Sequence, residues 1–194
     1  MQSKEQQMKG FVINLLEINL PEFYYYHNVE HTLYVLDKAM EIAKQEKCSP
    51  EEIRLLYAAV LWHDTGYLKT YAGHEEESCK LARQYLPAYG YSTADINKIC
   101  GMIIATKTPQ SPQNKSEEII ADADLEYLGT ELVGKKTEDL FEEMLYLNPG
   151  LTKSQWNHAQ VLFLQQHHYF TKYCKERKEP VKQEYLNKLI RELR

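Results

Sequence analysis

The chain has 194 residues, of which 43% are apolar and 26% are charged, and its net charge is −5. These values are ordinary for a soluble globular protein, and the length suits one domain with a real core, with or without an appendage. The lack of a basic patch makes duplex nucleic acid a poor partner, and no run of about 18 uncharged apolar residues suggests a membrane span.

The N-terminal residues and the cysteines bear on the cellular location. Residues 1–6 lack the apolar core of a signal peptide. The four cysteines lie at positions 48, 79, 100 and 174 and form no C-x-x-C pair. Reduced and mostly packed thiols fit this pattern, so we expect a cytoplasmic protein.

Apolar residues recur at helical spacing along almost the whole chain, and strand signals are nearly absent. The predicted helices cover about 4–18, 28–47, 50–64, 75–86, 93–105, 117–128, 137–146, 152–178 and 181–194. Their ends follow from capping residues and prolines, as in Ser49-Pro50 with Glu52 completing a capping box. The sequence therefore predicts an all-α fold in one domain, in which residues after about 130 form a helical flank or lid.

The C-terminal helices carry aromatic and basic residues in a regular pattern. The aromatic spacing within 152–178 predicts that this face joins the core, through Trp156, Ala159, Phe163, Gln166 and Phe170. The basic residues that follow are typical of a solvated face, and these are Lys172, Lys175, Arg177, Lys178, Lys182 and Lys188.

A histidine and an aspartate, His63 and Asp64, directly follow the apolar helical run 55–62. Adjacent side chains point about 100° apart on a helix, but at a helix end both can reach one small ligand. Imidazole nitrogen and carboxylate oxygen are both common ligands of divalent metals. The pair therefore suggests part of a metal site, which needs further ligands from elsewhere in the chain.

Two other residues complete a candidate ligand set. His31 lies in the first turns of the helix that Asn28 caps, and Asp124 falls on the buried stripe of the helix 117–128. A carboxylate on a core face is costly unless a positive charge meets it, and a metal would supply that charge. Each residue taken alone is more commonly a hydrogen-bonded core residue, so the prediction depends on the whole set.

The order of these residues resembles the HD superfamily of metal-dependent phosphohydrolases. Residues 26–32, Tyr-His-Asn-Val-Glu-His-Thr, are similar to the family's first motif, and residues 58–67 contain its His-Asp pair followed by a glycine. Residues 103–106 and the following proline-containing loop resemble the stretch before the last aspartate. The resemblance covers roughly residues 22–130.

The resemblance implies a helical bundle around a metal held by His31, His63, Asp64 and Asp124. It implies a phosphohydrolase that cleaves a phosphoester or phosphoanhydride of a small molecule, such as a nucleotide, with metal-activated water. Manganese, iron, zinc, nickel and magnesium all remain open as the metal. Asp122 is the alternative to Asp124 as the last ligand. Since only His74 follows the His-Asp pair closely, one metal ion is expected rather than two.

The predicted catalytic residues are Asp64, His74 and Lys107. His74 would flank the metal and donate to a phosphate, and Lys107 would contact a phosphate as a point charge. The alternatives without a catalytic role are that residues 74–78 form an acidic helix start that the macrodipole favours, and that Lys107 is a solvated loop lysine.

Two rival functions remain from the sequence. One is a non-catalytic nucleotide- or signal-binding module of the same fold that retains the metal, and the other is a helical protein with a purely structural His-Asp pair. The oligomeric state is open, with a homo-oligomer among the choices.

Overall fold

The computed structural model describes residues 3–193, so the predicted end of the last helix at Arg194 lies outside the described residues. Within this range the chain is helical and contains no strand, which confirms the all-α prediction. The α-helices are α1 (Lys4–Asn19), α2 (Val29–Gln45), α3 (Pro50–Trp62), α4 (His74–Tyr85), α5 (Thr93–Ala105), α6 (Lys115–Asp124), α7 (Val133–Leu147), α8 (Lys153–Gln166), α9 (Lys172–Arg177) and α10 (Glu179–Glu192). Three short 3-10 helices are η1 (Thr65–Leu68), η2 (Leu86–Tyr89) and η3 (Glu126–Gly129).

Side-chain caps fix where several of these helices begin. Ser3, Ser49, Ser92 and Thr152 each accept a hydrogen bond from a backbone N–H in the first turn and form a complete capping box. A cap satisfies backbone donors that would otherwise have no partner at the helix start. Local sequence therefore accounts for these four boundaries.

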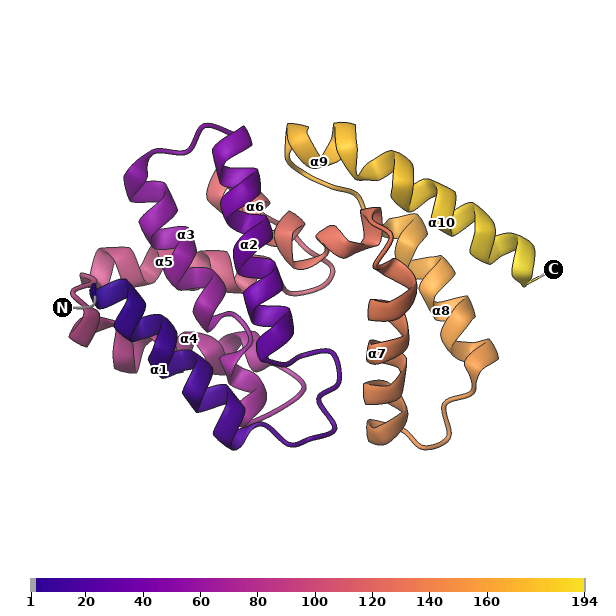
Figure 1. Cartoon of the computed structure of the whole chain (residues 1–194), viewed down its shortest axis with the longest axis horizontal. Coiled ribbons are helices and arrows are strands. Elements are labelled where there is room, and N and C mark those ends of the chain that lie inside the picture. Colours follow the sequence, from indigo (N-terminus) through magenta and orange to yellow (C-terminus); the bar gives the residue numbers. More distant parts are fainter. Residues whose placement is uncertain (1–2, 194) are drawn as a thin grey trace.

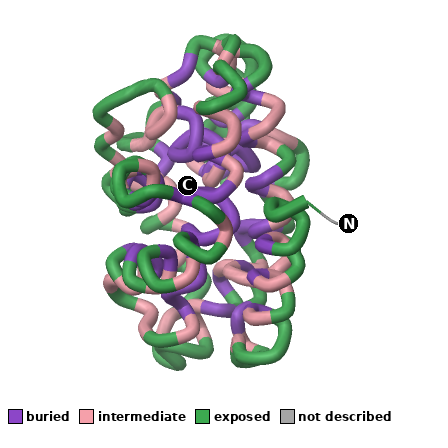
Figure 2. Tube along the Cα trace, turned by 90° about the vertical axis from the view of Figure 1, so that its left-hand side faces the viewer, coloured by how far each residue is buried: buried purple, intermediate pink, exposed green. Residues whose placement is uncertain are grey.

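Helices α1 to α6 form a bundle around one large hydrophobic cluster (Figure 1). Helices α2, α3 and α6 pack on one another, and α5 packs on both α3 and α6. Trp62, Leu61 and Ile103 are fully buried within this cluster. In Figure 2 the buried residues are the purple segments of the tube, and they lie mainly toward the interior of the molecule. This packing gives a rigid frame for the ends of α2, α3 and α6.

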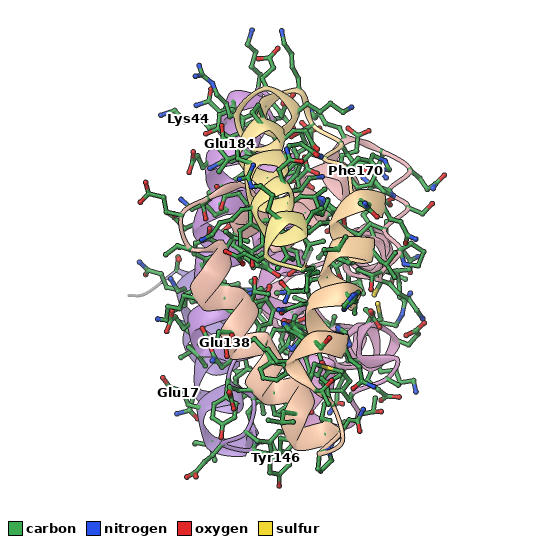
Figure 3. All side chains as sticks on the ribbon, turned by 90° about the vertical axis from the view of Figure 1, so that its right-hand side faces the viewer. Glu17, Lys44, Glu138, Tyr146, Phe170 and Glu184 are labelled. Atoms are coloured by element: carbon green, nitrogen blue, oxygen red, sulfur yellow. The ribbon has the colours of Figure 1, made fainter. Side chains whose placement is uncertain are left out.

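Helices α7, α8 and α10 stand beside that bundle and share a second, smaller cluster (Figure 1). Its buried residues include Leu128 from η3, Leu164 from α8 and Leu186 from α10. Figure 3 views the molecule from this side, with α7 and α8 running alongside each other in front of the bundle. None of the helices in the described range is long and apolar enough to cross a membrane.

Two predicted helices are interrupted in the structure. The helix predicted over 152–178 ends at Gln166, and a new helix begins after Thr171, whose side chain accepts from the backbone N–H of Cys174. The helix predicted over 117–128 ends at Asp124 and continues as the 3-10 helix η3. Contacts distant in the sequence cause the first break, because the carboxylate of Asp122 binds the backbone N–H groups of Phe170 and Thr171.

The prediction of a solvated lysine face is wrong for Lys182, which is fully buried. Its ammonium donates to the backbone carbonyl of His167 and lies 2.9 Å from a carboxylate oxygen of Glu179. These partners offset the cost of removing the charge from water. The predicted core role of the α8 aromatic residues is also wrong in part, since Trp156 and Phe163 are only partly buried and line a cavity.

Candidate metal centre

Three helix ends bring the candidate ligands together. His31 lies in the first turn of α2, where Asn28 accepts a hydrogen bond from its backbone N–H. His63 and Asp64 follow the last residue of α3, and Asp124 is the last residue of α6. Helices α2, α3 and α6 pack directly on one another, and this packing holds their ends in place.

The ligand atoms form a compact group. One potential ligand atom each from His31, His63 and Asp124 lies within 4.8 Å of the others. The Nε2 atom of His31 is 3.0 Å from Oδ1 of Asp124. Asp64 joins the group through Oδ2, which is 3.2 Å from Nε2 of His63 and 3.5 Å from Nε2 of His31. Two imidazoles and two carboxylates around one point are a ligand set for a divalent transition metal.

A hydrogen bond to the backbone fixes the orientation of the His63 ring. Its Nδ1 lies 2.7 Å from the backbone carbonyl of Val60, so Nδ1 carries the proton and donates it. Nε2 therefore faces the centre of the group, as in a metal-binding histidine. Nε2 of His63 and Oδ2 of Asp64 are both buried without a hydrogen-bond partner. Because buried polar atoms nearly always have partners, these two atoms fit a cation between them.

The electrostatics of the group also favour a cation. Burial disfavours the charged imidazolium, and it lowers the pKa of His31, but at His63 the Asp64 and Asp124 carboxylates outweigh burial and raise the pKa well above its usual value. Burial acts to raise the pKa of Asp124, yet the hydrogen bond from His31 and the nearby charge of His63 hold it at about 2. The pKa of Asp64 is also well below its usual value, since the charge of His63 outweighs burial there. Both carboxylates are therefore ionised.

The turn after α3 explains how neighbouring residues serve one site. Asp64 has a non-helical backbone (φ −103°, ψ 3°), so its side chain departs from the helical direction. The hydroxyl of Ser78 donates to the backbone carbonyl of His63 and accepts from the N–H of Gly66, at 2.6 and 2.8 Å. Both bonds are buried, so α4 fixes the turn that holds the His-Asp pair.

Asp122 lies away from this group. Its carboxylate accepts hydrogen bonds from the backbone N–H groups of Phe170 and Thr171 and from the Thr171 hydroxyl, at 2.7 to 2.8 Å. Burial raises the pKa of Asp122 to about 6. Of the two aspartates that the sequence left open, the structure brings Asp124 to the histidines and ties Asp122 to the loop before α9.

The other two predicted site residues lie at the edge of the group. Nε2 of His74 is 3.5 Å from Oδ1 of Asp64, and its ring stacks on Tyr67 with 3.8 Å between centroids. Lys107 is half-exposed and forms an ion pair of 2.5 Å with Glu76. His74 is therefore beside the ligand cluster, whereas Lys107 lies on the rim with its charge already paired.

A histidine–glutamate pair beside the cluster was not predicted as part of the site. Glu143 of α7 is fully buried and accepts hydrogen bonds from the backbone N–H groups of Tyr26 and His27, both at 3.0 Å. Its second oxygen lies 2.5 Å from Nδ1 of His27. A signal for it exists, because Glu143 shares a helical stripe with Leu140 and Leu147, and a carboxylate on an apolar stripe needs a partner.

A cavity of about 550 Å³ opens beside the ligand cluster. Its acidic, basic and histidine lining residues all come from the part of the chain up to α6, and these are His27, Asp64, His74, Glu75, Lys107 and Asp124. The opposite wall comes from the C-terminal helices and is uncharged, with Thr137, Leu140, Met144, Trp156, Ala159, Gln160, Phe163, Leu164 and Tyr185. This volume is typical of a small-molecule site.

Three solved structures share this fold at low sequence identity. A protein from an uncultured Thermotogales bacterium, described as a predicted HD superfamily hydrolase, has a TM-score of 0.63 and 19% identity, over 95% of this chain and 90% of that chain. Bacillus subtilis YpgQ, in complex with ADP, has a TM-score of 0.63 and 17% identity, over 97% and 94%. A Lactobacillus plantarum protein has a TM-score of 0.66 and 14% identity, over 99% and 97%.

The sequence comparisons give a family but no close relative. No curated protein matches the chain. The model of the HD domain family matches residues 28–126, which is more than half of the chain and includes all four candidate ligands. The chain therefore belongs to the HD domain family.

Proposed function

We propose that the protein is a metal-dependent phosphohydrolase in which His31, His63, Asp64 and Asp124 hold one divalent metal ion. The observation that carries the proposal is the pair of buried atoms without a partner, Nε2 of His63 and Oδ2 of Asp64. They face each other at 3.2 Å within a ligand set from three helices. A divalent ion bound there would lower the pKa of a bound water and offset charge on a phosphate oxygen.

The chain's own residues would position the phosphate. His74 and His27 both line the cavity and contact the ring of Tyr67, on which His74 stacks at 3.8 Å and His27 lies tilted at 4.3 Å between centroids. Glu143 binds Nδ1 of His27, so only Nε2 of that ring remains for a substrate oxygen. The two rings would orient the phosphate for attack by water, since positioning and electrostatics supply most of the catalysis in phosphoryl transfer.

The substrate that fits this cavity best is a nucleotide with a single phosphate. The uncharged wall of the cavity suits a base, and the solved structure of Bacillus subtilis YpgQ, which shares the fold, contains ADP. The lining of the cavity contains one lysine, Lys107, and no arginine. The charge of Lys107 is already paired with Glu76. A polyphosphate tail needs more cationic partners than this, which favours a phosphomonoester.

Replacing Asp64 tests the function. We expect Asp64→Ala to keep the helical circular dichroism of the parent and to lose at least a hundredfold in phosphomonoester hydrolysis together with its bound metal. Asp37→Ala is the matched control, because the Asp37 carboxylate is exposed on α2, pairs with Lys38 and lines no part of the cavity. A pure, metal-loaded parent protein that binds nucleotides but leaves them intact would instead support a non-catalytic binding module.

A further inference from the structure

Helix α8 presents one face to the cavity rather than to the core. Its lining residues Trp156, Ala159, Gln160, Phe163 and Leu164 follow the spacing i, i+3, i+4, i+7 and i+8, which places them on a single helix face. Among the residues of α8 only Leu164 is buried. The apolar face of this helix is therefore used mainly as a cavity wall, since little of it is packed away from solvent.

The chemistry of this wall suits a flat and largely apolar group. Trp156 and Phe163 supply two aromatic rings, and Leu140 and Met144 of α7 add aliphatic and thioether surface. Aromatic rings stack on planar heterocycles, and such contacts are tolerant of which base is bound. Because no charged residue of α7, α8 or α10 lines the cavity, a phosphate would favour the opposite end, beside the metal ligands.

Gln160 is the polar exception on the apolar face of α8. It lies between Trp156 and Phe163 on the helix, and its side-chain amide makes no hydrogen bond to any residue in the described part of the chain. Its amide offers both a donor and an acceptor, which is the combination that the edge of a nucleobase presents in return. A free amide within an apolar wall points to a ligand that carries a complementary polar edge.

We propose that α8 binds the base of the substrate, which stacks on Trp156 and Phe163 while the Gln160 amide hydrogen-bonds to the edge of the base. The proposal rests on the proposed function for the phosphate end of the same cavity. It assigns substrate selection to a helix beyond residue 126, where the match to the HD domain model ends.

Removal of the amide at position 160 tests the proposal. We expect Gln160→Leu to raise KM for adenosine monophosphate about tenfold, the effect of one lost hydrogen bond to a buried partner. Both kcat and KM for ribose 5-phosphate, which lacks a base, should stay at the parent values. Gln165→Leu is the matched control, since Gln165 is exposed on the same helix and is absent from the cavity lining. Equal losses on both substrates, or no loss on either, would overturn the proposal.

A binding measurement separates this proposal from the proposed function, because it needs no turnover. We expect the parent protein to bind at least one of adenosine, guanosine, cytidine and uridine in isothermal titration calorimetry, and Gln160→Leu to weaken that binding about tenfold. If nucleosides bind but no phosphoester is hydrolysed, the base site stands and the phosphohydrolase function fails. If the protein hydrolyses ribose 5-phosphate but binds none of the four nucleosides, the base site is wrong and the function stands.

Discussion

Asp122 and Asp124 lie two residues apart on one helix and contact different parts of the molecule. Asp124 meets the two histidines of the ligand set, whereas Asp122 accepts three hydrogen bonds from Phe170 and Thr171. Successive helix positions two apart differ by about 200°, so both cannot face the same object. One carboxylate belongs to the site and the other to the support of the C-terminal segment.

Replacing the two aspartates separately should have opposite effects on the free energy of unfolding and on the metal content. We expect Asp122→Ala to lower the free energy of unfolding by about 3 kcal/mol, because it leaves the buried N–H groups of Phe170 and Thr171 without a partner. Its metal content should stay at the parent level. We expect Asp124→Ala to lose the metal while the metal-free protein keeps most of its stability. Denaturant titration measures the stability of each variant, and elemental analysis measures its metal content. Loss of metal in Asp122→Ala alone would contradict the assignment of Asp124 as the ligand.

At the scale of single residues, sequence patterns identified the candidate ligands, which the fold brings together, but missed the residues that surround them. His31, His63, Asp64 and Asp124 were predictable because they occur in order in recognisable local contexts. Glu143 was not predicted, although its place on an apolar stripe was visible. Its partner His27 lies 116 residues away, and no local pattern joins residues at such a separation.

At the scale of elements, the turn after α3 depends on a close approach of α4. A Cβ atom added at Gly66 would lie 1.8 Å from the carbonyl oxygen of His74, at the first residue of α4. No side chain fits at that distance, so the glycine allows η1 and the start of α4 to touch. This contact places His74 beside Asp64 and lets Ser78 bind the turn.

Alanine at position 66 should therefore damage both the fold and the site. We expect Gly66→Ala to lower the free energy of unfolding by about 3 kcal/mol, because backbone must move to relieve the overlap. Gly10→Ala is the control, since nothing lies within 4 Å of a Cβ added at Gly10 in α1. It should stabilise the protein by about 1 kcal/mol through helix propensity. Thermal denaturation compares the two, and similar values for both variants would contradict the close approach.

The predicted helices were correct where capping residues fixed their ends and wrong where tertiary contacts did. The capping box at Ser49 was visible in the sequence and holds in the structure. The break between α8 and α9 was not predicted, because aromatic periodicity continues through it. The contacts that make it come from Asp122 on α6 and from Lys182 on α10, and both lie far from the break in sequence.

At the scale of the whole molecule, the cavity separates two parts with different cores. The α1–α6 bundle has a large buried cluster, which Tyr169 and, from α9, Cys174 also join, and the side of α7, α8 and α10 has a smaller one. A few contacts join them across the cavity, including Glu143 to His27, Tyr71 to Met144 Sδ at 3.1 Å, and stacking of Phe23 on Tyr146 at 4.0 Å. The C-terminal side is therefore the part whose stability depends most on what fills the cavity.

Hydrogen exchange should show this difference directly. We expect backbone amides of α7 and α8 to exchange faster than those of α2, α3 and α6, because fewer buried contacts hold these two helices. Adenosine monophosphate should slow exchange in α8 by joining its cavity face to the metal end. Inorganic phosphate, which lacks a base, should protect the ends of α2, α3 and α6 and leave α8 unchanged. Equal protection of α8 by the two ligands would mean that phosphate binding alone protects this helix, and that the base has no part in it.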